Sequence, residues 1–119
     1  MANQAPLDGV EFLINGEPTD NRLGIATRGA LRIRLEATGR AAHSAYPHLG
    51  ESAINRMVAA IAEINLTDWG SHDLLGKTTV NVGVVRGGER PNIIPAEAEC
   101  ELIFRLVTTP EEEIGRAHV

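Results

Sequence analysis

The chain has 119 residues, of which 43% are hydrophobic and 23% charged, as in a single soluble globular domain, and it is too short for two. Its formal net charge of −5 provides no basic face, so neither nucleic acid nor a membrane surface is an expected partner. The single cysteine, Cys100, excludes an internal disulfide. Because the N-terminal residues lack the basic and apolar stretches of a secretory signal, we expect a cytoplasmic protein.

The first half of the chain shows two kinds of periodicity. Gly9 to Ile14 reads as a short strand, and a polar turn follows it. From Ile25 to Thr38, apolar and polar residues then alternate, which predicts a strand with one buried and one wet face. After a loop over residues 40–50, apolar residues recur at spacings of three and four from Ile54 to Ile64. This spacing predicts an amphipathic helix.

The second half of the chain predicts two more strands and the start of a helix. Alternation from Thr79 to Arg86 indicates one strand, and the clearest alternation in the chain, Glu97 to Leu106, indicates the next. Thr109-Pro110-Glu111-Glu112 combines an N-cap, a proline at the first helical position and a capping-box glutamate. Because the sequence continues only to Val119, we expect this helix to be cut short.

These elements predict an α+β fold, a ferredoxin-like antiparallel sheet with helices on one face, because each strand has only one apolar side. We expect three strands, with room for a fourth that the chain does not supply. The first helix is expected to pack on the apolar face of the sheet, formed by Leu31, Ile33, Leu35, Val80, Val82, Val84, Cys100, Leu102 and Phe104.

Three polar side chains are candidates for chemistry. His43 lies in a loop of small residues just after a strand, where it could donate a hydrogen bond to a developing oxyanion or bind a metal; a surface histidine without a task is the alternative. Asn92 lies between two prolines that would hold its amide in place, or it is simply a turn residue. Arg105, on the wet face of an acidic strand, could bind a carboxylate or pair with a neighbouring acid.

Four motifs occur in one order: Gly39-Arg-Ala-Ala-His-Ser-Ala-Tyr-Pro47, Gly50-Glu-Ser-Ala-Ile54, Asn92-Ile-Ile-Pro95 and Phe104-Arg105. As a set, they resemble the dimerisation (lid) domain of the zinc amidohydrolases and metallopeptidases. That family includes acetylornithine deacetylase, succinyl-diaminopimelate desuccinylase, aminoacylase, carnosinase and glutamate carboxypeptidase. The resemblance extends from Gly16 to about Thr109. One difference is Ile103, which stands where many members carry an acid.

The resemblance implies a role for each matching residue. His43 matches the lid histidine that reaches across a homodimer and stabilises the oxyanion in the partner's active site. Asn92 matches a residue that holds the substrate, and Arg105 matches the arginine that binds its free carboxylate. Glu17 resembles an acid that ligates one zinc ion, with a plain turn glutamate as the alternative. The implied substrates are small N-acyl amino acids or peptides.

The same resemblance implies that the chain is part of a larger enzyme. Residues 1–24 would be the remnant of the catalytic domain's last strand and a linker, and residues 25–119 an incomplete lid domain. The family's two zinc ions per active site are held mainly by motifs that this sequence lacks, so the isolated chain is expected to bind no zinc and to be inactive. The alternative is a non-catalytic ferredoxin-like module for self-association or binding.

Overall fold

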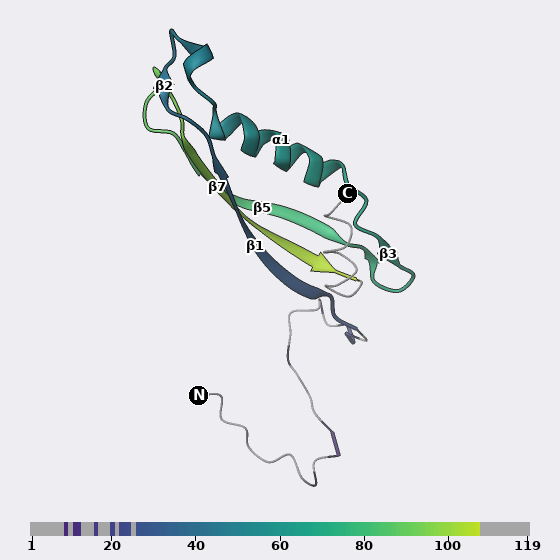
Figure 1. Ribbon diagram of the computed structural model, residues 1–119. Coiled ribbons are helices and arrows are strands. Elements are labelled where there is room, and N and C mark those ends of the chain that lie inside the picture. Colours follow the sequence, from purple (N-terminus) through teal and green to yellow (C-terminus); the bar gives the residue numbers. More distant parts are fainter. Residues whose placement is uncertain are drawn as a thin grey trace.

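A three-stranded antiparallel sheet with one helix on one face forms the body of the domain. The computed structural model describes residues 9, 11–12, 16, 20, 22–24 and 26–107. Strands β1 (Gly29–Thr38), β5 (Thr79–Gly87) and β7 (Glu97–Leu106) lie in the order β1-β7-β5, and α1 (Ala53–Leu66) crosses one face of them (Figure 1). The predicted α+β fold is confirmed.

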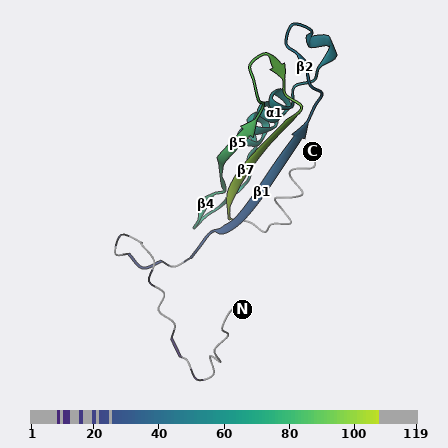
Figure 2. The ribbon, with the colours of Figure 1, turned by 90° about the vertical axis from the view of Figure 1, so that its left-hand side faces the viewer.

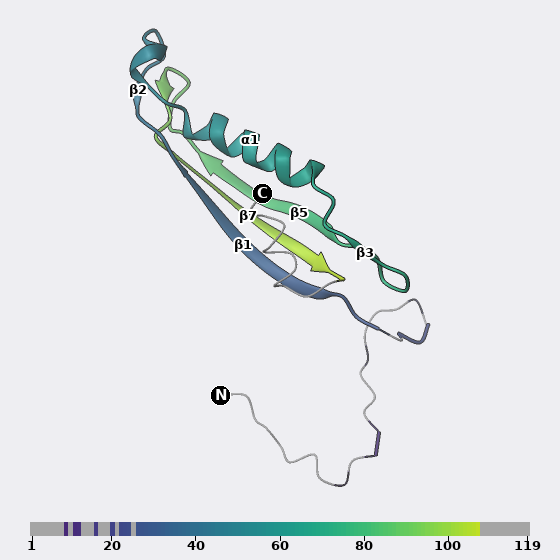
Figure 3. The same ribbon diagram turned by 45° about the vertical axis from the view of Figure 1, so that its right-hand side comes forward.

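Two short ribbons extend the sheet at its two ends. Strand β2 (Ala42–His43) pairs with β6 (Ile93–Ile94), and a single 3₁₀ turn, η1 (Pro47–Leu49), follows β2. At the opposite end, β3 (Ser71–His72) pairs with β4 (Gly76–Lys77). Figures 1 and 3 place β2 beyond the start of α1 and β3 beyond its end.

Strand β7 lies at the centre of the sheet and supplies most of the core. Its residues alternate strictly between the helix side, where they are buried, and the opposite side, where they are half-buried or exposed. On the helix side, Phe104 packs edge-on against Trp69, with ring centroids 4.8 Å apart. The Trp69 indole N–H donates to the carbonyl of Ile64 over 2.8 Å, which ties the end of α1 to the core. The buried core comprises Ala53, Met57, Trp69, Ala98, Cys100, Leu102, Phe104 and Leu106.

Val84, which was predicted for the apolar face of the sheet, lies on the outer face instead. Val80 and Val82 pair with Phe104 and Leu102 and pack against the core as expected. The register then shifts between Val82 and Val84, so Val84 is opposite Glu101 on the outer face. This bulge at Gly83 adds one residue to β5, which reverses the alternation behind it. The expectation that Val84 contributes to the apolar face was therefore wrong.

The ends of the predicted elements differ from the pattern by a few residues. Residues 26–28 precede β1 instead of belonging to it, and α1 extends one residue before and two after the periodic segment. Ser52 caps α1, and its hydroxyl accepts a hydrogen bond from the Asn55 N–H at 3.2 Å. In the proposed Gly9–Ile14 strand, Glu11 and Phe12 have no regular structure, and most of the rest lies outside the described residues. The capping box at residues 109–112 also lies outside them.

The helices of the described residues include none that is long and apolar enough to cross a membrane. The thiol of Cys100 is fully buried, and burial raises its pKa. Because the thiolate is the reactive form, Cys100 acts as a packing residue, as expected.

Replacing Phe104 with alanine should lower the free energy of unfolding by about 3–5 kcal/mol, because the ring leaves a cavity beside Trp69. Urea denaturation of this chain would measure the change. The control is Leu74→Ala in the β3–β4 turn, where the side chain is 60% exposed and the loss should stay below about 0.5 kcal/mol. Equal losses in the two variants would contradict the assignment of the core.

Candidate functional site

His43 lies on the β2–β6 ribbon, which projects past the end of the main sheet (Figure 2). Its backbone pairs with Ile93, and the next residue, Ser44, donates its N–H to the carbonyl of Asn92 over 2.9 Å. The His43 carbonyl accepts from the Tyr46 N–H at 2.9 Å, which closes a tight turn. The histidine is exposed and its backbone is fixed on both sides, so the ribbon presents the imidazole at the tip of the molecule.

The hydrogen bonding of the imidazole defines what it can do. Nδ1 of His43 accepts a hydrogen bond from the Ala45 N–H at 3.1 Å. An imidazole nitrogen that accepts carries no proton, so the proton of the neutral ring is on Nε2. Nε2–H is therefore a donor, and His43 has no hydrogen bond through Nε2 to any other residue of the described chain. An exposed, oriented N–H donor is what the stabilisation of an oxyanion requires.

Two glycines allow the backbone at the base of the ribbon to approach its neighbours closely. A Cβ atom on Gly39 would lie 2.0 Å from the carbonyl oxygen of Glu51, and one on Gly50 would lie 2.6 Å from Cδ1 of Ile94. Between them, the backbone N–H groups of Arg40 and Glu51 donate to each other's carbonyl groups over 2.8 and 2.9 Å. Only glycine fits at these two positions without moving the loop that carries His43.

Asn92 is exposed in a turn beside His43, closed by a hydrogen bond from the Ile93 N–H to the carbonyl of Arg90. The Asn92 amide makes no side-chain hydrogen bond within the part of the chain that the structure describes. The structure thus brings together two candidates that are far apart in sequence. The ribbon that joins them was missed in the sequence analysis, although the apolar pair Ile93-Ile94 between prolines is a signal for it.

Arg105 lies at the other end of the sheet. It is on β7 opposite Ala30 and Thr79, exposed on the face away from α1, whereas Asn92 precedes the start of that strand. Eight residue steps from Glu97 to Arg105 correspond to about 26 Å along the strand. Arg105 pairs with no acid among the described residues. Arg105 and His43 of one chain cannot contact the same small molecule.

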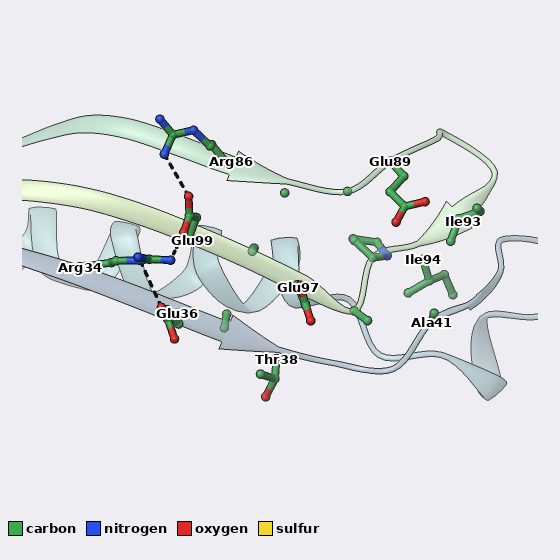
Figure 4. Close-up of a pocket in the computed structure, with 16 residues that line it drawn as sticks. Arg34, Glu36, Thr38, Ala41, Arg86, Glu89, Ile93, Ile94, Glu97 and Glu99 are labelled. Atoms are coloured by element: carbon green, nitrogen blue, oxygen red, sulfur yellow. Dashed lines mark hydrogen bonds and ion pairs between the residues drawn. The ribbon is translucent and has the colours of Figure 1, made fainter.

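An open groove of about 800 Å³ lies on the outer face of the sheet, next to the ribbon (Figure 4). At one end, Arg34 and Arg86 both bind the carboxylate of Glu99, at 2.5 and 2.9 Å. The hydrogen bond from Arg86 is the main reason why the pKa of Glu99 lies below its usual value. The carboxylates of Glu89 and Glu97 also border the groove, and neither has an ion pair within the described chain. Because both contact Glu99, the charges of Arg34 and Arg86 are compensated within the domain.

The described residues do not supply a metal site. No three histidine, cysteine or carboxylate side chains among them lie close enough together to hold an ion. Glu17, the predicted zinc ligand, lies outside the described residues. The zinc ions implied by the resemblance therefore do not fit the part of the chain seen here.

Comparison with known proteins identifies the family. The family model of the M20 peptidase dimerisation domain matches residues 25–117. The chain belongs to this family. A dimerisation domain is a module for self-association, and its architecture here is the one expected from the sequence resemblance. The M20 peptidases are zinc-dependent hydrolases, so this domain is homologous to part of a metallopeptidase.

The relatives are much longer than this chain. A peptidase M20 domain-containing protein of Schizosaccharomyces pombe is 41% identical over 106 residues, which cover 89% of this chain and 26% of that protein. A protein of Aspergillus flavus named as a probable carboxypeptidase is 42% identical over 109 residues, covering 84% and 26%. The M20 dimerisation domain described here thus spans about a quarter of the length of the curated relatives it matches.

Two solved structures also align with this chain over only part of their own length. An aminobenzoyl-glutamate utilization protein from Klebsiella pneumoniae aligns with a TM-score of 0.59 at 26% identity, covering 76% of this chain and 23% of that one. A tripeptidase from Staphylococcus aureus aligns with a TM-score of 0.57 at 31% identity, covering 73% and 22%.

Replacing Gly39 with alanine should destabilise the domain by about 1–3 kcal/mol, because the new methyl group overlaps the Glu51 carbonyl. Thermal denaturation of the chain would measure the loss. The control is Gly83→Ala, where the added Cβ meets its nearest neighbours at 3.6 and 3.8 Å and should cost much less. A Gly39→Ala variant as stable as wild type would show that the loop can move away at no cost.

Proposed function

We propose that this chain is the lid and dimerisation domain of a di-zinc amidohydrolase that cleaves the amide bond of N-acyl amino acids or small peptides. In the full-length enzyme, His43 of one subunit would donate a hydrogen bond from Nε2 to the substrate oxygen in the partner's active site, as negative charge develops on it. The observation that carries this proposal is the exposed Nε2–H donor at the tip of the ribbon. Residues of the catalytic domain, outside the described chain, would hold the zinc ions, and we expect the enzyme to be cytoplasmic.

The positions of the three candidates support a site divided between two subunits. His43 and Asn92 are neighbours at one end of the sheet, whereas Arg105 lies near the other end of β7, about 26 Å along the strand from Glu97. If His43 acts in the partner's site, Asn92 goes with it, and Arg105 serves the site of its own subunit. Arg105 would bind the free carboxylate of the substrate through its two-pronged guanidinium group.

The edge of β5 is the favoured surface for self-association. Among the described strands, β5 pairs on one side only, with β7. Near this edge, Val85 of β5 is 55% exposed, and Val58 of α1 is 57% exposed. Unpaired strand edges with exposed apolar residues favour pairing with another chain, whereas the charged residues that alternate along β1 discourage it. A two-fold axis beside β5 would join two sheets into one.

His43→Ala in the full-length enzyme should lower kcat by about 10²–10³. Mixing this variant with a subunit whose metal ligands have been replaced should restore roughly a quarter of wild-type activity. Half of the randomly formed dimers are then mixed, and each mixed dimer has one complete site. Asn92→Ala should be rescued in the same way. Arg105→Gln should not be rescued, because its arginine belongs to the site with intact metal ligands.

Wild-type turnover by the His43→Ala homodimer would remove the catalytic role. The non-catalytic self-association module would then be the better description of this domain. Loss of activity without rescue in the mixed dimers would instead mean that His43 acts within its own subunit.

The mass of the 119-residue chain in solution tests the surface of association. By size-exclusion chromatography with light scattering, the wild-type chain should be a dimer, and Val85→Lys should shift it to a monomer, because the lysine places a charge beside the unpaired edge. The control Leu74→Lys introduces the same charge at an exposed leucine in the β3–β4 turn, outside β5, and should leave the dimer intact. A dimer that persists in Val85→Lys would place the contact elsewhere.

A further inference from the structure

The outer face of the sheet, opposite α1, is divided by charge into two halves. In the half nearest the His43 ribbon, the two arginines of the described strands are both paired with acids. Arg34 contacts Glu36 and Glu99 at 3.1 and 2.5 Å, and Arg86 contacts Glu99 and Glu101 at 2.9 and 3.3 Å. Figure 4 shows Glu99 between the two arginines. Neither of these two arginines is left uncompensated for a ligand.

The other half of the face, in the described strands, carries two arginines, and the nearest acid to them, Glu101, is diagonal to Arg32 and is bound by Arg86. Strand pairing sets Arg32 opposite Ile103 and Arg105 opposite Ala30, so Arg32 and Arg105 are diagonal neighbours on adjacent strands of one face. On the other side of β7, Asn81 is opposite Ile103 and Thr79 is opposite Arg105, and both are neutral. Diagonal neighbours in a sheet are roughly 7–8 Å apart, within reach of long side chains.

Both guanidinium groups are exposed, and neither makes an ion pair or a side-chain hydrogen bond with another residue of the described chain. Like charges this close disfavour each other until an anion binds. Each guanidinium can take a carboxylate in a bidentate pair. The half-buried side chain of Ile103 lies between them on the same face, next to where the carbon chain of such an anion would lie.

We propose that Arg32 and Arg105 together form a subsite for a substrate with two carboxylates, such as an N-acyl glutamate or a peptide that ends in an acidic residue. Arg105 binds one carboxylate and Arg32 the other. This inference rests on the proposed function, because it assigns to Arg105 the carboxylate of the substrate. It adds Arg32 as a residue that determines specificity, and it names the class of substrate.

The test compares two ligands that differ only in charge at one position, N-acetylglutamate and N-acetylglutamine. Binding to the full-length enzyme is measured by titration calorimetry, and turnover is measured where it occurs. The wild-type enzyme should bind the glutamate ligand about tenfold more tightly or better, the gain expected of one additional charged hydrogen-bonded pair. Arg32→Gln should abolish this preference and leave the affinity for N-acetylglutamine within about twofold of wild type.

Two further variants sharpen the result. Arg34→Gln is the matched control, because Arg34 lies on the same strand and the same face but is already bound by Glu36 and Glu99. It should keep the preference for glutamate. Arg32→Lys, which retains the charge without the bidentate fork, should recover part of the preference. In hydrolysis, the effect of Arg32→Gln should appear in KM for the glutamate substrate and leave kcat nearly unchanged.

Several results would overturn the proposal: a wild-type enzyme that binds neither ligand, one that does not prefer glutamate, or an Arg32→Gln variant that loses affinity for both ligands equally. The last result would mean that Arg32 supports the fold or pairs with an acid of the catalytic domain. The outcome is separate from that of the His43 experiment. The ligand preference is measured by binding. It can therefore be absent while His43 still acts in the partner's site, and it can be present even if His43 does not act there.

Discussion

The alternation of β7 is the constraint on which the other features of this domain depend. As the central strand, it pairs with β1 over its whole length and with β5 from Ala98 to Arg105, and α1 packs on its buried side chains. The same alternation sends every second residue, from Glu97 to Arg105, to the opposite face. A single strand therefore fixes the core and the distribution of charge on the outer face, because side chains of a strand alternate with a period of two.

The geometry of the tip follows from contacts that are local in space and distant in sequence. His43 and Asn92 meet because β2 pairs with β6, and the ribbon is held at its base by the close approach at Gly39 and Gly50. In this arrangement the imidazole depends on few neighbours for its orientation, chiefly the N–H of Ala45. An exposed donor on a rigid ribbon suits a group that must act on a molecule bound to another domain, since no further reorganisation is needed at the moment of reaction.

The outer face illustrates how ion pairs can set specificity by removing charges as well as by providing them. Arg34 and Arg86 share Glu99, and exposed pairs of this kind contribute little to stability. Their consequence is electrostatic: Arg34 and Arg86 are compensated by acids, while Arg32 and Arg105 have no ion pair among the described residues. An anionic ligand is therefore attracted to one end of the face, the end of β7 opposite to the His43 ribbon.

The fold class and the identity of the candidate residues were accessible from the sequence by itself. Periodicity predicted all three long strands and α1, because burial of one face imposes a period of two or 3.6 on apolar residues whatever the rest of the fold. The motifs singled out His43, Asn92 and Arg105. Periodicity could not reveal the bulge at Gly83, because an extra residue in one strand is defined only by its partner, and so Val84 was assigned to the wrong face.

The tertiary structure alone decided the strand order, the contact of His43 with the turn of Asn92, and the distance of both from Arg105. It also decided which arginines are compensated, since the partners of Arg34 and Arg86 lie 65 and 13 residues away from them at Glu99. Local patterns record which side of an element is buried, whereas pairing between elements depends on the free energy of the whole packed chain. For that reason the candidate residues could be named in advance, but their arrangement could not.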